Sequence, residues 1–291
     1  MLKDRIISGV LLAGMLVVVA NFLPSPVCWL LLVAIAALAQ YEFYAMLDKA
    51  GLPVFRVVGM ISGAAVISTT FWTIGPEAKQ LAAGYRWENL VLLLTLMFVF
   101  VRQFPAKDVK QPIVTIAVTL LGVFYVAFLL NYITRLTFGW RDTGFSHAVG
   151  PTGRMMILYL VGVVKISDVG AFFTGRSLGR NKLFPRLSPK KTWEGLIGGI
   201  VSSLVMSLLF FWLTGGELGS VSFGLHDAII LGLVLPVVAV VGDLFESLIK
   251  RAAGVKDSGS MIPGMGGVLD VLDSLMFGAP VLYAYVTIFL D

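Results

Sequence analysis

The sequence predicts an all-α polytopic integral membrane protein with about nine transmembrane helices. Of its 291 residues, 58% are hydrophobic and only 13% are charged, and the mean hydropathy is +0.91. Soluble domains keep about a quarter of their residues charged. The apolar residues gather in separate stretches, most of them long enough to cross about 30 Å of hydrocarbon. Lipid offers no hydrogen-bond partner to the backbone, so these stretches are expected to be helical.

Nine apolar stretches follow one another along the chain. The first comes after the charged start MLKDR but is long for a signal peptide and has no small-residue cleavage site, so we expect a retained span. The fourth is short and the eighth contains acids, which leaves eight or ten spans as alternatives. The stretches are 6–23, 27–47, 54–75, 88–101, 112–133, 155–175, 195–214, 227–249 and 274–290.

The basic residues are distributed unequally between the two sets of span ends. Sixteen of the 22 Lys and Arg residues fall at the ends that share a side with the N-terminus, and five fall at the opposite ends. The positive-inside rule therefore predicts a cytoplasmic N-terminus and, with nine spans, a C-terminus outside. The net charge of +5 reflects this bias, so we expect no nucleic-acid partner.

No long linker, internal repeat or low-complexity tract interrupts the chain, which predicts a single integral membrane domain over 1–291. Two pairs of glycines have the spacing that lets helices approach closely, and we expect them to pack against neighbouring helices. These pairs are Gly59 with Gly63 and Gly195 with Gly199.

Four acidic residues stand out in the last two apolar segments. Asp243 and Glu246 are three residues apart, as are Asp270 and Asp273, so each pair can project from one helix face. Carboxylates in a membrane are costly, and a converging set of oxygen ligands without imidazole suits Mg²⁺. The alternative is that the acids cap helix ends or pair with their basic neighbours, which are Lys250, Arg251 and Lys256.

The sixth segment contains Lys165 and Asp168, one helical turn apart. A simple ion pair within the membrane would explain both residues. The other interpretation makes Asp168 part of a polar site reached from the cytoplasm. The sequence leaves both open.

The loop 176–194 contains six basic residues. They are typical of a cytoplasmic loop that contacts anionic lipid headgroups. Ser188 is a good N-cap and Pro189 a good first helical residue, so we also expect a helix to begin here. Its free amides, next to Lys190 and Lys191, would attract phosphate.

A glycine-rich loop precedes the last segment and would let backbone amides approach a ligand closely. Neither a P-loop nor a dinucleotide-binding motif is present. Acids for Mg²⁺ and basic residues for phosphate favour phosphoryl or nucleotidyl transfer on a lipid. His147 and His226 fall on the predicted outer side and are expected to be structural or solvated.

Residues 247–273 resemble the signature of the phosphatidate cytidylyltransferases, also called CDP-diacylglycerol synthases. The matching residues are SLIKR, then Lys256-Asp257, then PGMGG followed by Asp270 and Asp273. Three upstream stretches are similar to the same family, and the recognisable motifs cover roughly 120–290. The resemblance makes 1–110 the N-terminal spans and 111–291 the catalytic spans. The three stretches are 168–176, SPKKTWEG at 188–195 and GDLFES at 242–247.

The resemblance implies that CTP and phosphatidic acid react to give CDP-diacylglycerol and pyrophosphate, with Mg²⁺ and a possible second cation. It also implies a homodimer that is embedded in the bacterial inner membrane and contacts membrane lipids. The active site would face the cytoplasm. The implied catalytic residues are Asp243, Asp270, Lys250 and Asp257. The implied metal ligands are Asp243, Asp270, Asp273 and Glu246. The implied substrate-binding residues are Ser188, Lys190, Lys191, Thr192, Arg176, Arg251, Lys256 and Asp168.

Two positions depart from the family signature: Met265 stands where the family has His, and Val271 where it has Arg. A divergent inactive paralogue is therefore one alternative. An ion- or proton-coupled transporter is another, although no internal repeat supports it. A CDP-alcohol phosphotransferase is a third, but its DG-x2-AR pattern is absent.

Overall fold

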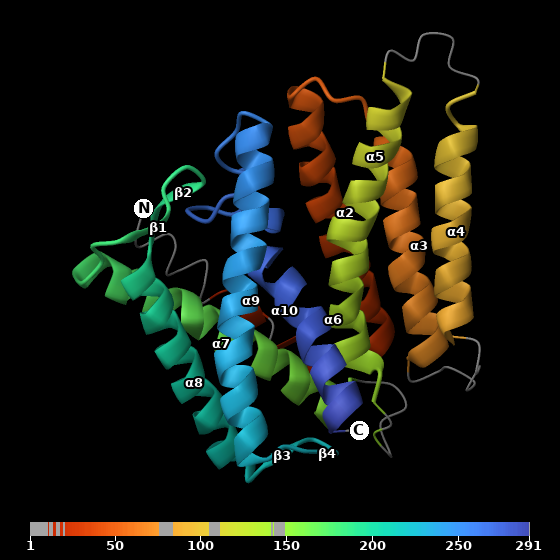
Figure 1. The fold of residues 1–291 in the computed structure, drawn as a ribbon. Helices are drawn as coiled ribbons and strands as arrows, with labels where there is room; N and C mark the ends of the chain where they lie inside the picture. Colours follow the sequence, from red (N-terminus) through yellow and green to blue (C-terminus); the bar gives the residue numbers. More distant parts are fainter. Residues whose placement is uncertain are drawn as a thin grey trace. The chain divides into compact units, whose positions relative to one another are not determined.

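The computed structural model describes residues 11, 14–15, 18–19, 21–75, 84–104, 111–140, 142 and 149–290. Helices dominate it (Figure 1). The helices are α2 (Ser25–Lys49), α3 (Arg56–Ile74), α4 (Gly84–Val101), α5 (Pro112–Gly122), the π-helix η1 (Val123–Phe128), α6 (Leu129–Phe138), α7 (Pro151–Ser177), α8 (Trp193–Thr214), α9 (Leu225–Ala252) and α10 (Val268–Phe289). The strands are β1 (Lys182–Phe184), β2 (Ser188–Thr192), β3 (Glu217–Leu218) and β4 (Val221–Ser222).

The prediction of an all-α integral membrane protein is confirmed. Within the described residues, seven helical segments are long and apolar enough to cross a membrane, with Pro112–Phe138 counted as one, and the apolar part of α4 is shorter. Every predicted stretch from 27–47 onward coincides with a helix. Most of the predicted first span, 6–23, lies outside the described residues. His147 also lies outside them.

The chain divides into two compact units, each built from separate stretches. The first contains Met1–Gly139, Gly144–Val149 and Ala252–Val271. The second contains Trp140–Thr143, Gly150–Arg251 and Leu272–Asp291.

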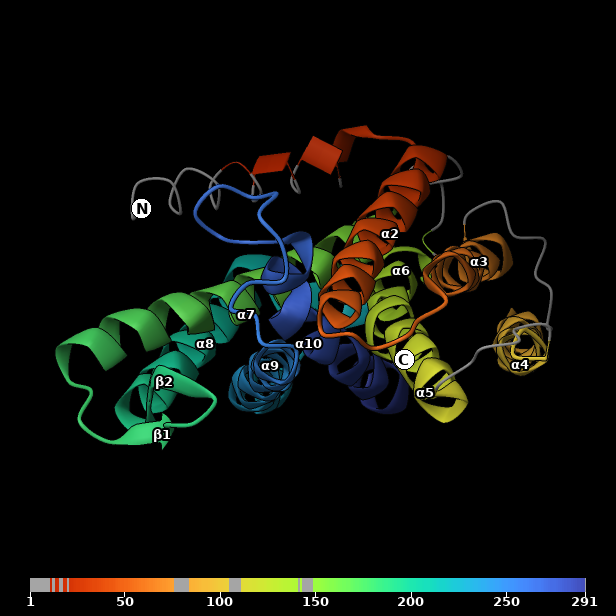
Figure 2. The same cartoon turned by 90° about the horizontal axis from the view of Figure 1, so that it is seen from above.

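In the first unit, α3 lies between α2 and α4 (Figure 2). A methyl group on Gly59 would lie 2.0 Å from the hydroxyl of Tyr44, and one on Gly63 would lie 2.1 Å from Oε1 of Gln40. The predicted packing role of this glycine pair is therefore confirmed. The Gln40 amide donates to the carbonyl of Gly59, and the Tyr44 hydroxyl donates to the carbonyl of Thr119, so polar side chains reinforce the close approach.

A buried polar cluster connects α3, α4 and α6 in the same unit. Glu88 is 3% exposed and forms an ion pair with Arg135, which is 6% exposed. The amide of Asn131 donates to Oε1 of Glu88 at 3.1 Å and to the hydroxyl of Thr70 at 2.8 Å. These contacts compensate a carboxylate and a guanidinium that would be costly to bury alone.

In the second unit, α7 and α8 pack along their length. Methyl groups on Gly195 and Gly199 would each lie 3.0 Å from a backbone oxygen of α7, so these glycines also serve helix packing. The opposite face of α8 exposes a row of large apolar residues, as a helix in lipid does. These are Trp193, Ile197, Val201, Val205, Leu209 and Trp212.

At the start of α9, Asp227 accepts hydrogen bonds from the Gly224 N–H at 2.8 Å and from the Tyr285 hydroxyl at 2.7 Å. It is buried and acts as a helix-terminal acceptor. The side chain of His226 is 77% exposed, which confirms the expectation of a solvated residue.

Candidate active site

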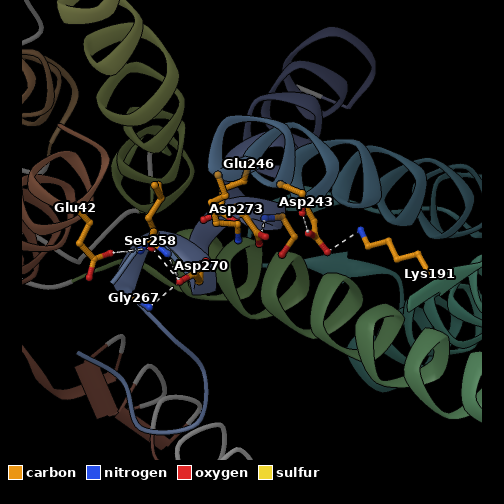
Figure 3. Close-up of polar contacts among 12 residues, drawn as sticks. Glu42, Lys191, Asp243, Glu246, Ser258, Gly267, Asp270 and Asp273 are labelled. Carbon is orange, nitrogen blue, oxygen red and sulfur yellow. Dashed lines mark hydrogen bonds and ion pairs between the residues drawn. The ribbon is translucent and has the colours of Figure 1, made fainter. Parts of the chain in front are cut away.

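Helices α9 and α10 bring three carboxylates together in the second unit (Figure 3). Asp243 and Glu246 lie one turn apart on α9, and Asp273 lies on α10; one oxygen from each is within 4.8 Å of the others. Glu246 is fully buried and Asp273 is 7% exposed. A methyl group on Gly242 would lie 2.6 Å from the carbonyl of Asp273, so this glycine lets α9 and α10 approach closely at the cluster.

Three lysines accompany these carboxylates. Lys191 Nζ lies 2.6 Å from Oδ2 of Asp243, and Lys250 donates to Oε2 of Glu246 one turn away on α9. Lys165 Nζ lies 3.0 Å from the hydroxyl of Ser274, the residue after Asp273. The basic groups offset the negative charge of the cluster and provide ammonium groups suited to phosphate oxygens.

Lys165 also lies 3.6 Å from Asp168 on the next turn of α7. The ion pair considered from the sequence is therefore present. The Asp168 carboxylate is 46% exposed, so pairing with Lys165 does not seal it from its surroundings.

A short hairpin positions Lys191. Strands β1 and β2 pair antiparallel, with an irregularity in register between Lys182 and Phe184. The Trp193 N–H donates to the carbonyl of Asn181 at 3.0 Å and closes the hairpin at the first residue of α8. The Asn181 amide in turn donates to Glu194 at 2.8 Å.

The predicted helix start at Ser188 and Pro189 is wrong. Both residues lie in β2, and α8 begins at Trp193. The N-cap is Thr192, whose hydroxyl accepts from the Gly195 N–H at 3.1 Å. The pairing of Ser188 with Phe184 competes with helix formation at Pro189, and Thr192 is also a good capping residue.

Asp270 lies at the start of α10, in the first unit. Its Oδ2 accepts from the N–H of Ser258 at 3.0 Å, from the hydroxyl of Ser258 at 2.9 Å and from the N–H of Gly267 at 2.8 Å (Figure 3). The last contact is one half of a capping box, in which the third residue of the helix accepts from the N–H of the residue before its start; Gly267 has no side chain to return the bond. The last span begins at Val268 rather than at residue 274, so Asp270 and Asp273 lie within the first turns of the helix. Asp270 is not in the three-carboxylate group, and its participation in a metal site stays a prediction.

The remaining predicted substrate-binding or catalytic residues lie in strand β2, near the ends of helices or in loops. Ser188 is half-buried. The exposed residues are Arg176, Lys190, Arg251, Lys256 and Asp257. Arg176, Lys190 and Lys256 are the cations among them whose exposed side chains suit a soluble or headgroup phosphate.

The sequence interpretation missed Glu42 on α2. It is 4% exposed, and its Oε2 accepts from the N–H of Leu269 at 2.9 Å and from the hydroxyl of Ser258 at 3.3 Å (Figure 3). An acid within the apolar stretch 27–47 was the available signal, because such residues are functional candidates by default.

The three-carboxylate group fits a hard divalent cation. Mg²⁺ prefers oxygen ligands and is commonly held by one or two carboxylates together with substrate phosphates. Asp243, Glu246 and Asp273 offer such oxygens close together, with ammonium groups beside them for phosphate.

Comparison with known proteins extends the match beyond these motifs. The model of the cytidylyltransferase family matches residues 3–289. A phosphatidate cytidylyltransferase of Haemophilus influenzae is 33% identical over 96% of this chain and 96% of its own length. A Synechocystis protein of the same name is 36% identical over 61% of this chain and 64% of its own, so the chain spans slightly less than two thirds of that relative. The uncharacterized protein YnbB of Escherichia coli is 36% identical over 54% of both chains. The match across 3–289 and the nearly complete alignment with the Haemophilus protein show that this chain belongs to the cytidylyltransferase family.

Proposed function

We propose that this protein is a phosphatidate cytidylyltransferase that makes CDP-diacylglycerol. A phosphate oxygen of phosphatidic acid attacks the α-phosphorus of CTP; the new P–O bond forms as the bond to the β-phosphate breaks, and pyrophosphate leaves. The observation that carries the proposal is the set of three carboxylates flanked by lysines, in a chain whose relatives carry this name. The sequence shows no internal repeat of the kind that transporters commonly have.

Asp243, Glu246 and Asp273 would hold Mg²⁺. The family resemblance alone supports Asp270 as a further ligand and a second cation. The bound metal supplies charge neutralisation for the triphosphate. The three carboxylates would hold the metal close to Lys191 and Lys250, which lie against two of them.

The basic residues bind and orient the phosphates. Lys191 and Lys250 already lie against the carboxylates, so their ammonium groups would contact phosphates bound at the same place. Catalysis of phosphoryl transfer depends largely on such positioning and charge stabilisation. The family resemblance gives Asp257 as a catalytic residue and Ser188, Thr192 and Asp168 as substrate contacts. More exposed basic groups would recruit CTP or the lipid headgroup. These groups are Arg176, Lys190, Arg251 and Lys256.

The membrane arrangement forms part of the proposal. Nine spans would place the N-terminus in the cytoplasm and the C-terminus outside, and the excess of basic residues on one side supports this orientation. The protein would span the bacterial inner membrane, and its active site would face the cytoplasm, where CTP is available. We further propose a homodimer, on the basis of the family resemblance.

Product analysis tests the function. Purified protein in detergent receives CTP labelled in the cytidine ring, phosphatidic acid and Mg²⁺. We expect label in the lipid phase and stoichiometric pyrophosphate in the aqueous phase. Water-soluble label alone, with several acyl chains and with Mn²⁺ as well as Mg²⁺, would overturn the proposal. Ion flux in proteoliposomes together with that result would favour a transporter.

A further inference from the structure

Glu42 joins parts of the chain that are far apart in sequence. It lies on α2, while both of its partners, Ser258 and Leu269, are near the C-terminal end of the first unit. A carboxylate this deeply buried in an apolar helix is costly unless its contacts compensate it. Its partners should therefore matter to the fold, to the reaction or to both.

The contact with Leu269 fixes the beginning of α10. The N–H groups in the first turn of a helix have no acceptor within the helix, and Glu42 supplies one at 2.9 Å from another helix. Its negative charge also lies near the positive end of the helix dipole.

The contact with Ser258 links Glu42 to Asp270. The single hydroxyl proton of Ser258 faces two carboxylates, with Asp270 Oδ2 at 2.9 Å and Glu42 Oε2 at 3.3 Å. Asp270 also accepts the N–H groups of Ser258 and Gly267. The segment from Ser258 to Gly267 is thus fastened at both ends, and Glu42 ties it to a long helix.

Two glycines make this arrangement possible. A methyl group on Gly267 would lie 2.4 Å from Oε2 of Glu42, and one on Gly259 would lie 2.5 Å from Oε1. No side chain with a Cβ fits either position without displacing the carboxylate. The glycine-rich character of this loop therefore has a specific partner in α2.

We propose that Glu42 is a positioning residue for the cytidylyl transfer. By holding the Leu269 N–H and the Ser258 hydroxyl, it fixes the loop that carries Lys256 and Asp257 and keeps Asp270 in its orientation. It acts through these groups and does not itself contact the reactants. The inference rests on the proposed function, and it adds a residue from outside the motif region 120–290.

Kinetics of variants test the inference. We expect Glu42→Ala to lower kcat/KM by about 10- to 100-fold per mole of folded protein, as the loss of a residue that orients metal or phosphate ligands does. Glu42→Gln keeps an acceptor oxygen and should recover most of the loss. Ser258→Ala should lower kcat/KM about 3- to 10-fold, the range for one hydrogen bond. The double variant Glu42→Ala/Ser258→Ala should lose less than the product of the single effects, because both remove the same bridge.

Glu88→Gln is the matched control, since Glu88 is also a buried acid of the N-terminal spans but pairs with Arg135. It should lower stability and leave kcat and KM of the folded fraction unchanged. A second readout is amide hydrogen exchange of residues 253–269, which should accelerate in Glu42→Ala and stay at the wild-type rate in Glu88→Gln.

The outcomes are separable. An active wild type with unchanged kcat/KM in folded Glu42→Ala overturns the inference and leaves the proposed function standing. If Glu42→Ala does not fold, wild-type kinetics in Ser258→Ala together with wild-type amide exchange of residues 253–269 in that variant overturn it instead. A wild type that makes no lipid-soluble product overturns the proposed function itself. Unchanged amide exchange of residues 253–269 in Glu42→Ala would then also show that Glu42 does not hold this loop.

Discussion

The ammonium of Lys191 lies 2.6 Å from Oδ2 of Asp243, although Lys191 belongs to strand β2 and Asp243 to helix α9. This contact brings the basic hairpin to the acidic cluster of the second unit. The two side chains are 22% and 35% exposed, and pairs with such access to solvent contribute little to stability. We therefore expect the contact to matter more to the proposed reaction than to the stability of the fold.

Lys191→Met should lower kcat/KM by about 10- to 100-fold, the range for one lost charged hydrogen bond to a phosphate. The free energy of unfolding should change by less than about 1 kcal/mol. Lys182→Met, in strand β1 of the same hairpin, is the control and should retain activity, because its side chain is exposed and has no partner in the carboxylate group. Equal losses in both variants would indicate a general effect of hairpin charge.

Asp243→Asn and Asp273→Asn should each reduce turnover at least about 100-fold, because each removes a carboxylate from the group that would hold Mg²⁺. Titration of the protein with Mn²⁺, followed by electron paramagnetic resonance, should show weaker binding in both. EDTA should abolish wild-type activity, and added Mg²⁺ should restore it. Asp227→Asn removes an acid at the other end of α9 and should leave metal binding intact. Full Mn²⁺ affinity in Asp243→Asn would exclude this residue as a ligand.

Glu88→Gln should destabilise the protein by about 3–5 kcal/mol, since it leaves the Arg135 guanidinium in a buried site without its ionic partner. The additional change Arg135→Met should recover part of this loss, because the second charge is then removed as well. Thermal unfolding in detergent, followed by circular dichroism, measures both effects. A fully additive loss would show that the two side chains act independently.

Thr192→Val should destabilise the protein by about 0.5–2 kcal/mol through loss of the cap on Gly195, while Thr192→Ser should retain most of it. Kinetics separate this role from the predicted substrate contact. A pure cap leaves KM of the folded protein unchanged in both variants. A raised KM for CTP or phosphatidic acid in Thr192→Val would show a direct role in binding.

The helices could be predicted from sequence because lipid permits few alternatives to them. Every segment from 27–47 onward coincides with a helix, although α10 begins at Val268 rather than at residue 274, and the spacing of Asp243 and Glu246 predicted their common face. The end of α8 nearest the hairpin was placed wrongly, because Ser188 and Thr192 are both good caps and only strand pairing distinguishes them.

The site could be predicted in part. The sequence predicted that the acids of the last two segments converge, and Asp273 does lie with the α9 carboxylates Asp243 and Glu246. Glu42 was not predicted, because its partners Ser258 and Leu269 are more than two hundred residues away along the chain. Contacts of this kind depend on how α2 packs, which local patterns do not encode.

The π-helix Val123–Phe128 lies within the continuous helical segment Pro112–Phe138 and determines in which direction the side chains of α6 point around the helix axis. A π turn accommodates one more residue than an α turn, so removal of a single residue here would turn α6 by about 100° about its axis. Asn131 and Arg135 would then point away from Glu88, with no change in either side chain. The number of residues in this short segment, as much as their chemistry, decides whether the buried ion pair forms.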